Sequence, residues 1–147
     1  MRPRTDTPCW IAVILSRPWL LPISRAALVS AFLLGGIQKL VDFNGAVSEQ
    51  AHFGLQPAWL WAAAAIVVEL GGSVLVIAGR CVWLGAGGLG VLTAVSMLVA
   101  NNFWAQSGHD RFIATNAFFE HLGLIAGLVL VTIPFSSQAE PGITRRF

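Results

Sequence analysis

Charged residues are scarce in this chain, and their scarcity excludes an ordinary water-soluble domain. Only nine Lys or Arg and seven Asp or Glu occur among 147 residues, whereas 56% of the residues are apolar. A soluble domain carries about a quarter charged residues, so this chain has too few to cover a surface that faces water on all sides. The formal net charge of +2 is too small to indicate nucleic-acid binding, and no basic patch is interleaved with aromatic residues.

The sequence also lacks a cysteine motif and a recognisable signal for cleavage. Cys9 and Cys81 form neither a CxxC pair nor a zinc-binding spacing. The apolar run at residues 9–15 stops at the Ser-Arg-Pro of residues 16–18, with no small-x-small cleavage site after it. We therefore interpret residues 1–18 as a cytoplasmic tail, and we expect both thiols to stay reduced without forming a disulfide.

Four stretches of the chain are long and apolar enough to cross a bilayer, which takes about 20 residues of helix. They cover residues 19–38, 58–79, 81–100 and 112–133. The connections between them are short, except for a loop at residues 42–57, and Pro134 is expected to end the last helix. The predicted fold is therefore an all-α, four-helix transmembrane bundle with up-down topology over residues 19–134, followed by a cytoplasmic tail at residues 135–147.

The distribution of Lys and Arg predicts how the bundle is oriented. With a cytoplasmic N-terminus, the basic residues on the cytoplasmic side are Arg2, Arg4, Arg17, Arg25, Arg80, Arg145 and Arg146. Only Lys39 and Arg111 then fall on the outer side. Because cytoplasmic loops carry the excess of positive charge, we predict a multi-pass protein of the plasma (inner) membrane with both termini in the cytoplasm.

The glycine-rich stretch GAGGLG at residues 85–90 has the spacing of the dinucleotide-binding pattern G-x-G-x-x-G but lacks its structural context. No strand precedes it, and it lies inside an uncharged predicted span. Small residues at Ala86, Gly90 and Ala94 indicate instead a face that another helix can approach closely. Gly123 and Gly127 form a similar face on the last span, and such faces are also candidates for a homo-oligomer contact.

The few polar residues of the spans converge on the predicted outer half of the bundle. Since an ionisable side chain inside a membrane costs about 2.5 to 3.5 kcal/mol, it is expected to face the bundle interior and a partner. The candidate ligand-binding or proton-relay residues are Lys39, Glu69, Asn101, Asn102, Glu120 and His121. We expect Glu120 to face the interior near Lys39 and Glu69, whereas His121, one position further, either joins this cluster or faces a neighbouring groove.

Three interpretations of this polar cluster stay open. In the first, Lys39 pairs with Glu69 or Glu120 and the asparagines cross-link helices, so the cluster is purely structural. In the second, the cluster binds a ligand such as a quinone headgroup, or moves a proton. In the third, His52 and His121 hold a metal or haem, but no H-x-x-x-H spacing supports this, and no metal site is predicted.

Short motifs in all four predicted spans resemble those of the DoxX family. They are GGIQKLVDF at 35–43, FGLQP at 53–57, ELGGSVLVIAGR at 69–80, NNFW at 101–104 and FFEHLGLIAG at 118–127. Their order and spacing carry the resemblance, which extends over residues 25–134. It implies a four-helix integral membrane bundle, in agreement with the independent count of spans.

The resemblance implies a link to membrane redox chemistry, because the family takes its name from the small subunit of a thiosulfate:quinone oxidoreductase. Its recurring polar positions match Lys39, Glu69 and the pair before Leu122. Many relatives have Lys-Asn where this chain has Glu120-His121, and a His where it has Asn101. The sequence contains no self-contained catalytic motif, so two functions stay open. The first is a quinone- or redox-linked membrane subunit, with quinone as a possible ligand and redox proteins as partners. The second is a non-catalytic scaffold that assembles a larger complex. A small-molecule carrier is less favoured, since four spans lack the repeated halves of many transporters.

Overall fold

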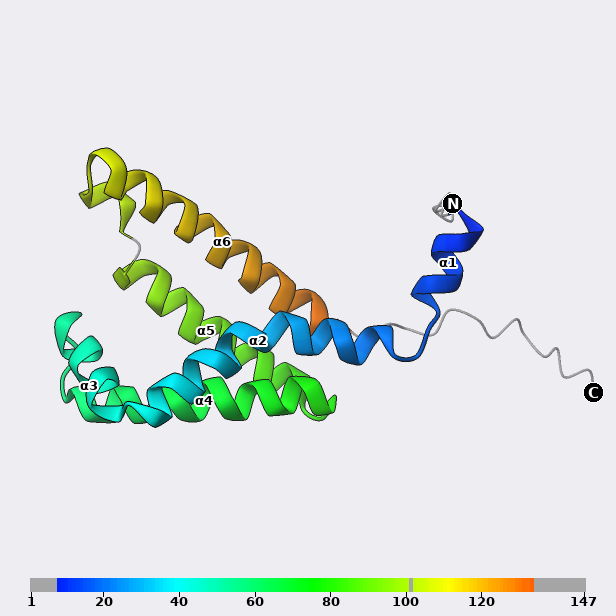
Figure 1. Ribbon diagram of the computed structural model, residues 1–147, viewed down its shortest axis with the longest axis horizontal. Coiled ribbons are helices and arrows are strands. Elements are labelled where there is room, and N and C mark those ends of the chain that lie inside the picture. Colours follow the sequence, from blue (N-terminus) through cyan, green and yellow to red (C-terminus); the bar gives the residue numbers. More distant parts are fainter. Residues whose placement is uncertain (1–7, 101, 134–147) are drawn as a thin grey trace, which may run out of the picture.

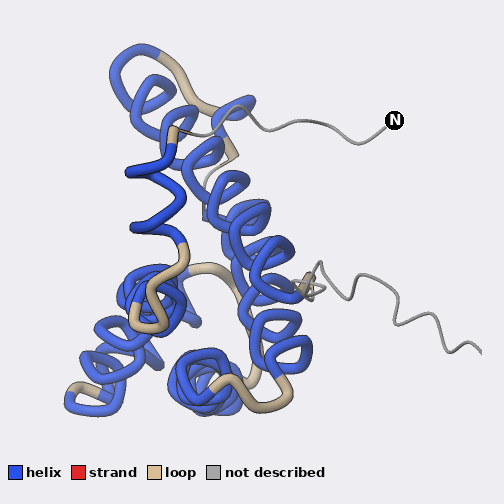
Figure 2. The backbone as a smooth tube through the Cα atoms, turned by 90° about the vertical axis from the view of Figure 1, so that its right-hand side faces the viewer, coloured by secondary structure: helices blue, strands red, loops and turns tan. Residues whose placement is uncertain are grey.

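The protein is described by a computed structural model that covers residues 8–100 and 102–133. The helices are α1 (Cys9–Leu15), α2 (Leu20–Val41), α3 (Phe43–His52), α4 (Ala58–Ala78), α5 (Val82–Ala100), the 3-10 turn η1 (Phe103–Ala105) and α6 (Gly108–Thr132). No strand occurs in these residues (Figure 2). Asn101, Pro134 and the predicted tail at residues 135–147 lie outside the described part of the chain.

Helices α2, α4, α5 and α6 are each long and apolar enough to cross a membrane. They coincide with the four predicted spans, so the prediction of an all-α transmembrane bundle is confirmed. The last span begins at Gly108, four residues before the predicted start. The connection at residues 42–57 is not a plain loop, because it contains α3. The Asp42 side chain caps this helix by accepting a hydrogen bond of 2.9 Å from the backbone N–H of Gly45.

The four long helices form a chain of neighbours rather than a closed ring (Figure 1). Helix α2 packs along α4, α4 along α5 and α5 along α6, whereas α2 and α6 contact each other only weakly. Helix α3 packs against α4. The apolar core between the long helices consists of Val29, Phe32, Val76, Ala86, Leu89 and Leu128.

Glycine pairs bring the helix axes together. A methyl group on Gly85 of α5 would lie 2.6 Å from the carbonyl oxygen of Gly72 of α4, so neither position has room for a side chain. The packing interpretation of residues 85–90 therefore holds, but its expected face is partly wrong. A methyl group on Gly90 would meet nothing within 4 Å, and the same is true of Gly123, whereas one on Gly127 would lie 3.0 Å from Leu28. The close approach occurs on another face of α5, because Gly85 and Leu89, not Gly90, lie against α4.

The turn between α4 and α5 also depends on a glycine. Gly79 ends α4 with φ of 69°, a left-handed conformation that disfavours side chains. A methyl group there would lie 2.7 Å from Nη1 of Arg25. The guanidinium of Arg25 therefore lies at the C-terminal end of α4, where a positive charge is favourable to the helix dipole. Cys81 in this turn and Cys9 in α1 are exposed, and both thiols are free.

Candidate functional site

An ion pair joins α2 to α4. Lys39, in the last turn of α2, donates a hydrogen bond of 2.8 Å from Nζ to Oε1 of Glu69, which lies near the middle of α4. Their side chains are 21% and 10% exposed, so this is a largely buried pair. Gly35 of α2 lies beside the pair, because a methyl group there would be in ordinary contact with Lys39 Nζ, at 3.5 Å.

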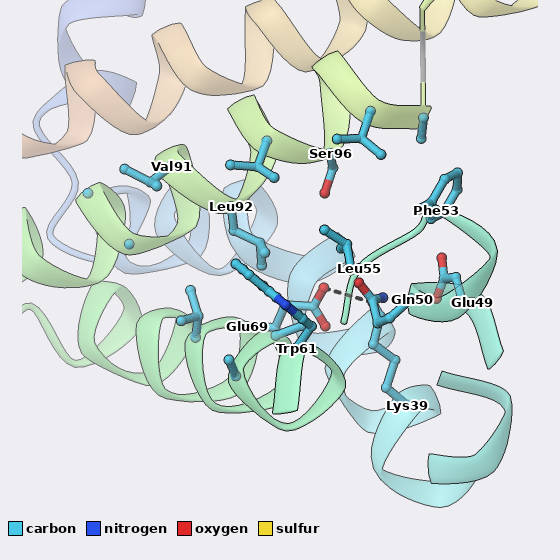
Figure 3. Close-up of a pocket in the computed structure, with 18 residues that line it drawn as sticks. Lys39, Glu49, Gln50, Phe53, Leu55, Trp61, Glu69, Val91, Leu92 and Ser96 are labelled. Atoms are coloured by element: carbon cyan, nitrogen blue, oxygen red, sulfur yellow. Dashed lines mark hydrogen bonds and ion pairs between the residues drawn. The ribbon is translucent and has the colours of Figure 1, made fainter. Parts of the chain in front are cut away.

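A pocket of about 490 Å³, the large pocket, lies beside this pair between α3, α4 and α5 (Figure 3). Helix α4 contributes Trp61 and Val68 in addition to Glu69 itself. Helix α5 contributes glycines and a valine stripe, namely Gly87, Gly88, Val91, Val95 and Val99. Helix α3 and the loop after it close one side with Glu49, Gln50, Phe53 and Leu55. The walls from α4 and α5 are therefore mainly apolar, and the buried charges are those of Lys39 and Glu69.

A second pocket of about 260 Å³, the small pocket, lies between α2, α4, α5 and α6 and includes Lys39 and Glu69 among its lining residues. Its other polar side chains are Thr93, Ser96 and His121. Because Ser96 also lines the large pocket, the ion pair and Ser96 lie where the two pockets adjoin.

The structure brings together three of the predicted site residues. Lys39, Glu69 and His121 all line the small pocket. Asn102 lines neither pocket, and its side-chain oxygen accepts a hydrogen bond of 3.3 Å from Gln106. Asn101 lies outside the described residues.

The expectation that Glu120 faces the bundle interior is wrong. Glu120 is exposed on α6, and Lys39 pairs with Glu69 instead. Adjacent residues of a helix point about 100° apart, so when His121 faces the small pocket, Glu120 faces away from it.

Several residues that line the two pockets could not be identified from the sequence alone. Thr93 and Ser96 are hydroxyl residues three positions apart on α5, and this spacing places them on one helix face. The signal that could have revealed them is the presence of two hydroxyl residues inside an otherwise uncharged span. Glu49, Gln50 and Phe53 also line the large pocket, but the sequence of residues 42–57 indicates a connection and not a wall of the site.

Comparison with known proteins identifies relatives of this chain. The model of the DoxX family matches residues 20–102. The chain is also similar to the inner membrane protein YphA of Escherichia coli (strain K12), with 25% identity over 118 residues that cover 80% of this chain and 84% of YphA. No solved structure matches.

Proposed function

This chain belongs to the DoxX family of integral membrane proteins, and we propose that it is a redox-linked membrane subunit that binds the headgroup of a quinone in the large pocket. The observation that carries the proposal is the placement of one buried ion pair, Lys39–Glu69, against an otherwise mainly apolar wall. Sites for small molecules commonly combine apolar walls with a few polar groups that fix the ligand's orientation.

Lys39 is the group that would hold the headgroup. An ammonium has three N–H donors, and the bond to Glu69 Oε1 uses one of them. A quinone offers carbonyl oxygens, which only accept hydrogen bonds, and therefore matches the remaining N–H groups of Lys39. Ser96, whose hydroxyl points into the pocket in Figure 3, supplies a further donor.

The exposed part of the lining favours access from the lipid rather than from water. Trp61, Val91, Val95 and Val99 all line the large pocket and are 37% to 67% exposed. Apolar side chains on the outside of a membrane helix face the acyl chains, so a lipophilic tail can lie along the α4–α5 groove while its headgroup reaches Lys39.

Gly87 offers a way to fill the large pocket without disturbing the fold. It lines the pocket, and a methyl group there would meet nothing within 4 Å. Gly90 is the matched control, because it lies on the same helix, has the same free space and lines neither pocket. Leucine at either position brings a similar gain in helix propensity, so a difference between the two variants reports on the pocket alone.

The test is binding of a short-chain ubiquinone analogue to the full chain in lipid nanodiscs, together with solvent extraction of lipophilic compounds from the protein purified in mild detergent. Quinone quenching of tryptophan fluorescence reports binding, with Trp61 in the wall as the expected reporter. We expect Gly87→Leu to weaken binding about tenfold or more, which is about 1.4 kcal/mol, and Gly90→Leu to bind as the wild type does. Absence of binding, or equal effects of the two variants, would refute the proposal and favour the scaffold.

A further inference from the structure

Glu120 is an acidic residue at a place where lipid offers it no partner. It lies at the middle of α6, twelve residues from Gly108 and twelve from Thr132, and its side chain is exposed. Each end of the helix is therefore about 18 Å away, while half of the hydrocarbon core measures about 15 Å. A glutamate side chain is too short to cross that distance, and acyl chains cannot form hydrogen bonds with its carboxylate. Within the described part of the chain, Glu120 takes part in no ion pair.

The face of α6 that carries Glu120 begins as a contact with α2 and then loses its neighbour. Four residues at spacings of three and four positions share this face, namely Asn116, Glu120, Gly123 and Gly127. A methyl group on Gly127 would lie 3.0 Å from Leu28 of α2, and from there the two helices diverge toward the start of α6 (Figure 1). A methyl group on Gly123 would meet nothing within 4 Å, and Asn116 and Glu120 are exposed. These three residues form an uncovered surface, the Glu120 face.

A second copy of this chain has no lysine or arginine among its described residues that could meet Glu120 at its depth. Two copies in the same orientation meet at equal depth, so Glu120 would face Glu120, and like charges repel. Lys39 is already paired with Glu69. The described arginines lie near helix ends or between helices, namely Arg17, Arg25, Arg80 and Arg111. Even Arg111, on α6 itself, precedes Glu120 by nine residues and is therefore about 14 Å away along the helix.

We propose that the Glu120 face binds a membrane-spanning helix of another protein, and that this helix carries a lysine or arginine that pairs with Glu120. Ionisable side chains inside membranes pair with one another, so a cation at equal depth supplies the partner that lipid cannot. Gly123 lets the backbone of the incoming helix approach closely, and the amide of Asn116, one turn away, offers a further hydrogen bond. Because Glu120 lines neither pocket, this contact is independent of quinone binding.

Binding of synthetic membrane-spanning peptides to the full chain in lipid nanodiscs tests this contact. The probe is a leucine–alanine helix with one central lysine, and the reference peptide has leucine in its place. Energy transfer from the six tryptophans of the chain to a dansyl group on the peptide reports binding. We expect the lysine peptide to bind the wild type about tenfold more tightly than the reference peptide, as for a polar contact between membrane helices. Glu120→Leu should remove this preference.

The matched control moves the carboxylate around the helix at nearly constant depth. Leu122 is exposed, and two residues turn a helix by about 200°. Glu120→Leu combined with Leu122→Glu therefore places the same group on the opposite side of α6, away from Asn116 and Gly123. This double variant should bind the lysine peptide more weakly than the wild type does. Equal binding would mean that the lysine seeks any carboxylate in the bilayer, and would overturn the assignment of this face.

Two other outcomes would also overturn the proposal. The first is equal binding of the two peptides by the wild type. The second is a dimer of the chain without any peptide, seen by native mass spectrometry and lost in Glu120→Leu, because a second copy would then cover the Glu120 face. Loss of quinone binding in Gly87→Leu changes none of these results, so the contact and the proposed function fail separately.

Discussion

Breaking the Lys39–Glu69 pair should destabilise the bundle strongly. At the observed separation of 2.8 Å, the Coulomb attraction is about 6 kcal/mol at an effective dielectric constant of about 20, and about 1.5 kcal/mol in water. Lys39 is about one-fifth exposed, so part of this attraction is screened. Lys39→Met also leaves a carboxylate buried without its partner, and such losses cost about 3 to 5 kcal/mol. We therefore expect the free energy of unfolding to fall by about 2 to 4 kcal/mol.

A double-mutant cycle separates the pair interaction from other effects of each substitution. Lys39→Met with Glu69→Gln removes both charges, so the double variant should recover a large part of the loss and give a coupling of about 2 kcal/mol or more. The control cycle pairs Lys39→Met with Glu120→Gln, whose effects should add within about 0.5 kcal/mol. Reversible unfolding in mixed detergent micelles supplies the free energies. Additive effects in the Glu69 cycle, or coupling in the Glu120 cycle, would refute the geometry on which the proposed function depends.

Two further predictions test the packing and the orientation of the bundle. Gly85→Ala should lower the free energy of unfolding by about 1 to 3 kcal/mol, because its methyl group would lie 2.6 Å from the Gly72 carbonyl oxygen. The methyl group of Gly90→Ala would meet nothing within 4 Å, so this variant should be neutral or slightly stabilising in the same unfolding assay. Equal effects of the two variants would contradict the α4–α5 contact. Both termini are predicted to be cytoplasmic from the distribution of Lys and Arg, so reporter fusions at Phe147 should be active in the cytoplasm and fusions within residues 42–57 on the outer side; an exported C-terminus would reverse the predicted topology.

The four spans could be predicted because a membrane imposes length and composition directly on the sequence. About 20 apolar residues are needed wherever the helix lies in the bundle, so no tertiary information is required. The burial of Lys39 and Glu69 in one cluster could also be predicted, because a charged side chain in lipid needs a partner. Which carboxylate pairs with Lys39 could not be predicted, because Glu69 and Glu120 lay at similar expected depths.

The rotation of α6 explains why Glu120 was placed wrongly. Apolar residues occur all round the part of this helix that follows His121, so no polar face marks the side that packs on α5. Adjacent helix residues point about 100° apart, so an error of one position in the predicted inward face of α6 places Glu120 there instead of His121. The same ambiguity affected Gly85 and Gly90 in α5, where glycines occur at four of six consecutive positions. Only the packing of each helix against its neighbour decides which of them lies in the contact.

The position of the ion pair at the junction of the two pockets has a consequence that neither pocket has alone. A headgroup that accepts hydrogen bonds from Lys39 in the large pocket competes with Oε1 of Glu69 for the same ammonium. As that competition weakens the pair, the Glu69 carboxylate would lose part of its compensating charge in a low-dielectric environment. The small pocket also borders the pair, because Lys39, Glu69 and His121 are among its lining residues. Under the proposed function, binding of a headgroup and the strength of the Lys39–Glu69 pair are therefore linked, and the linkage is reciprocal: a change that weakens the pair leaves the ammonium more available to a headgroup.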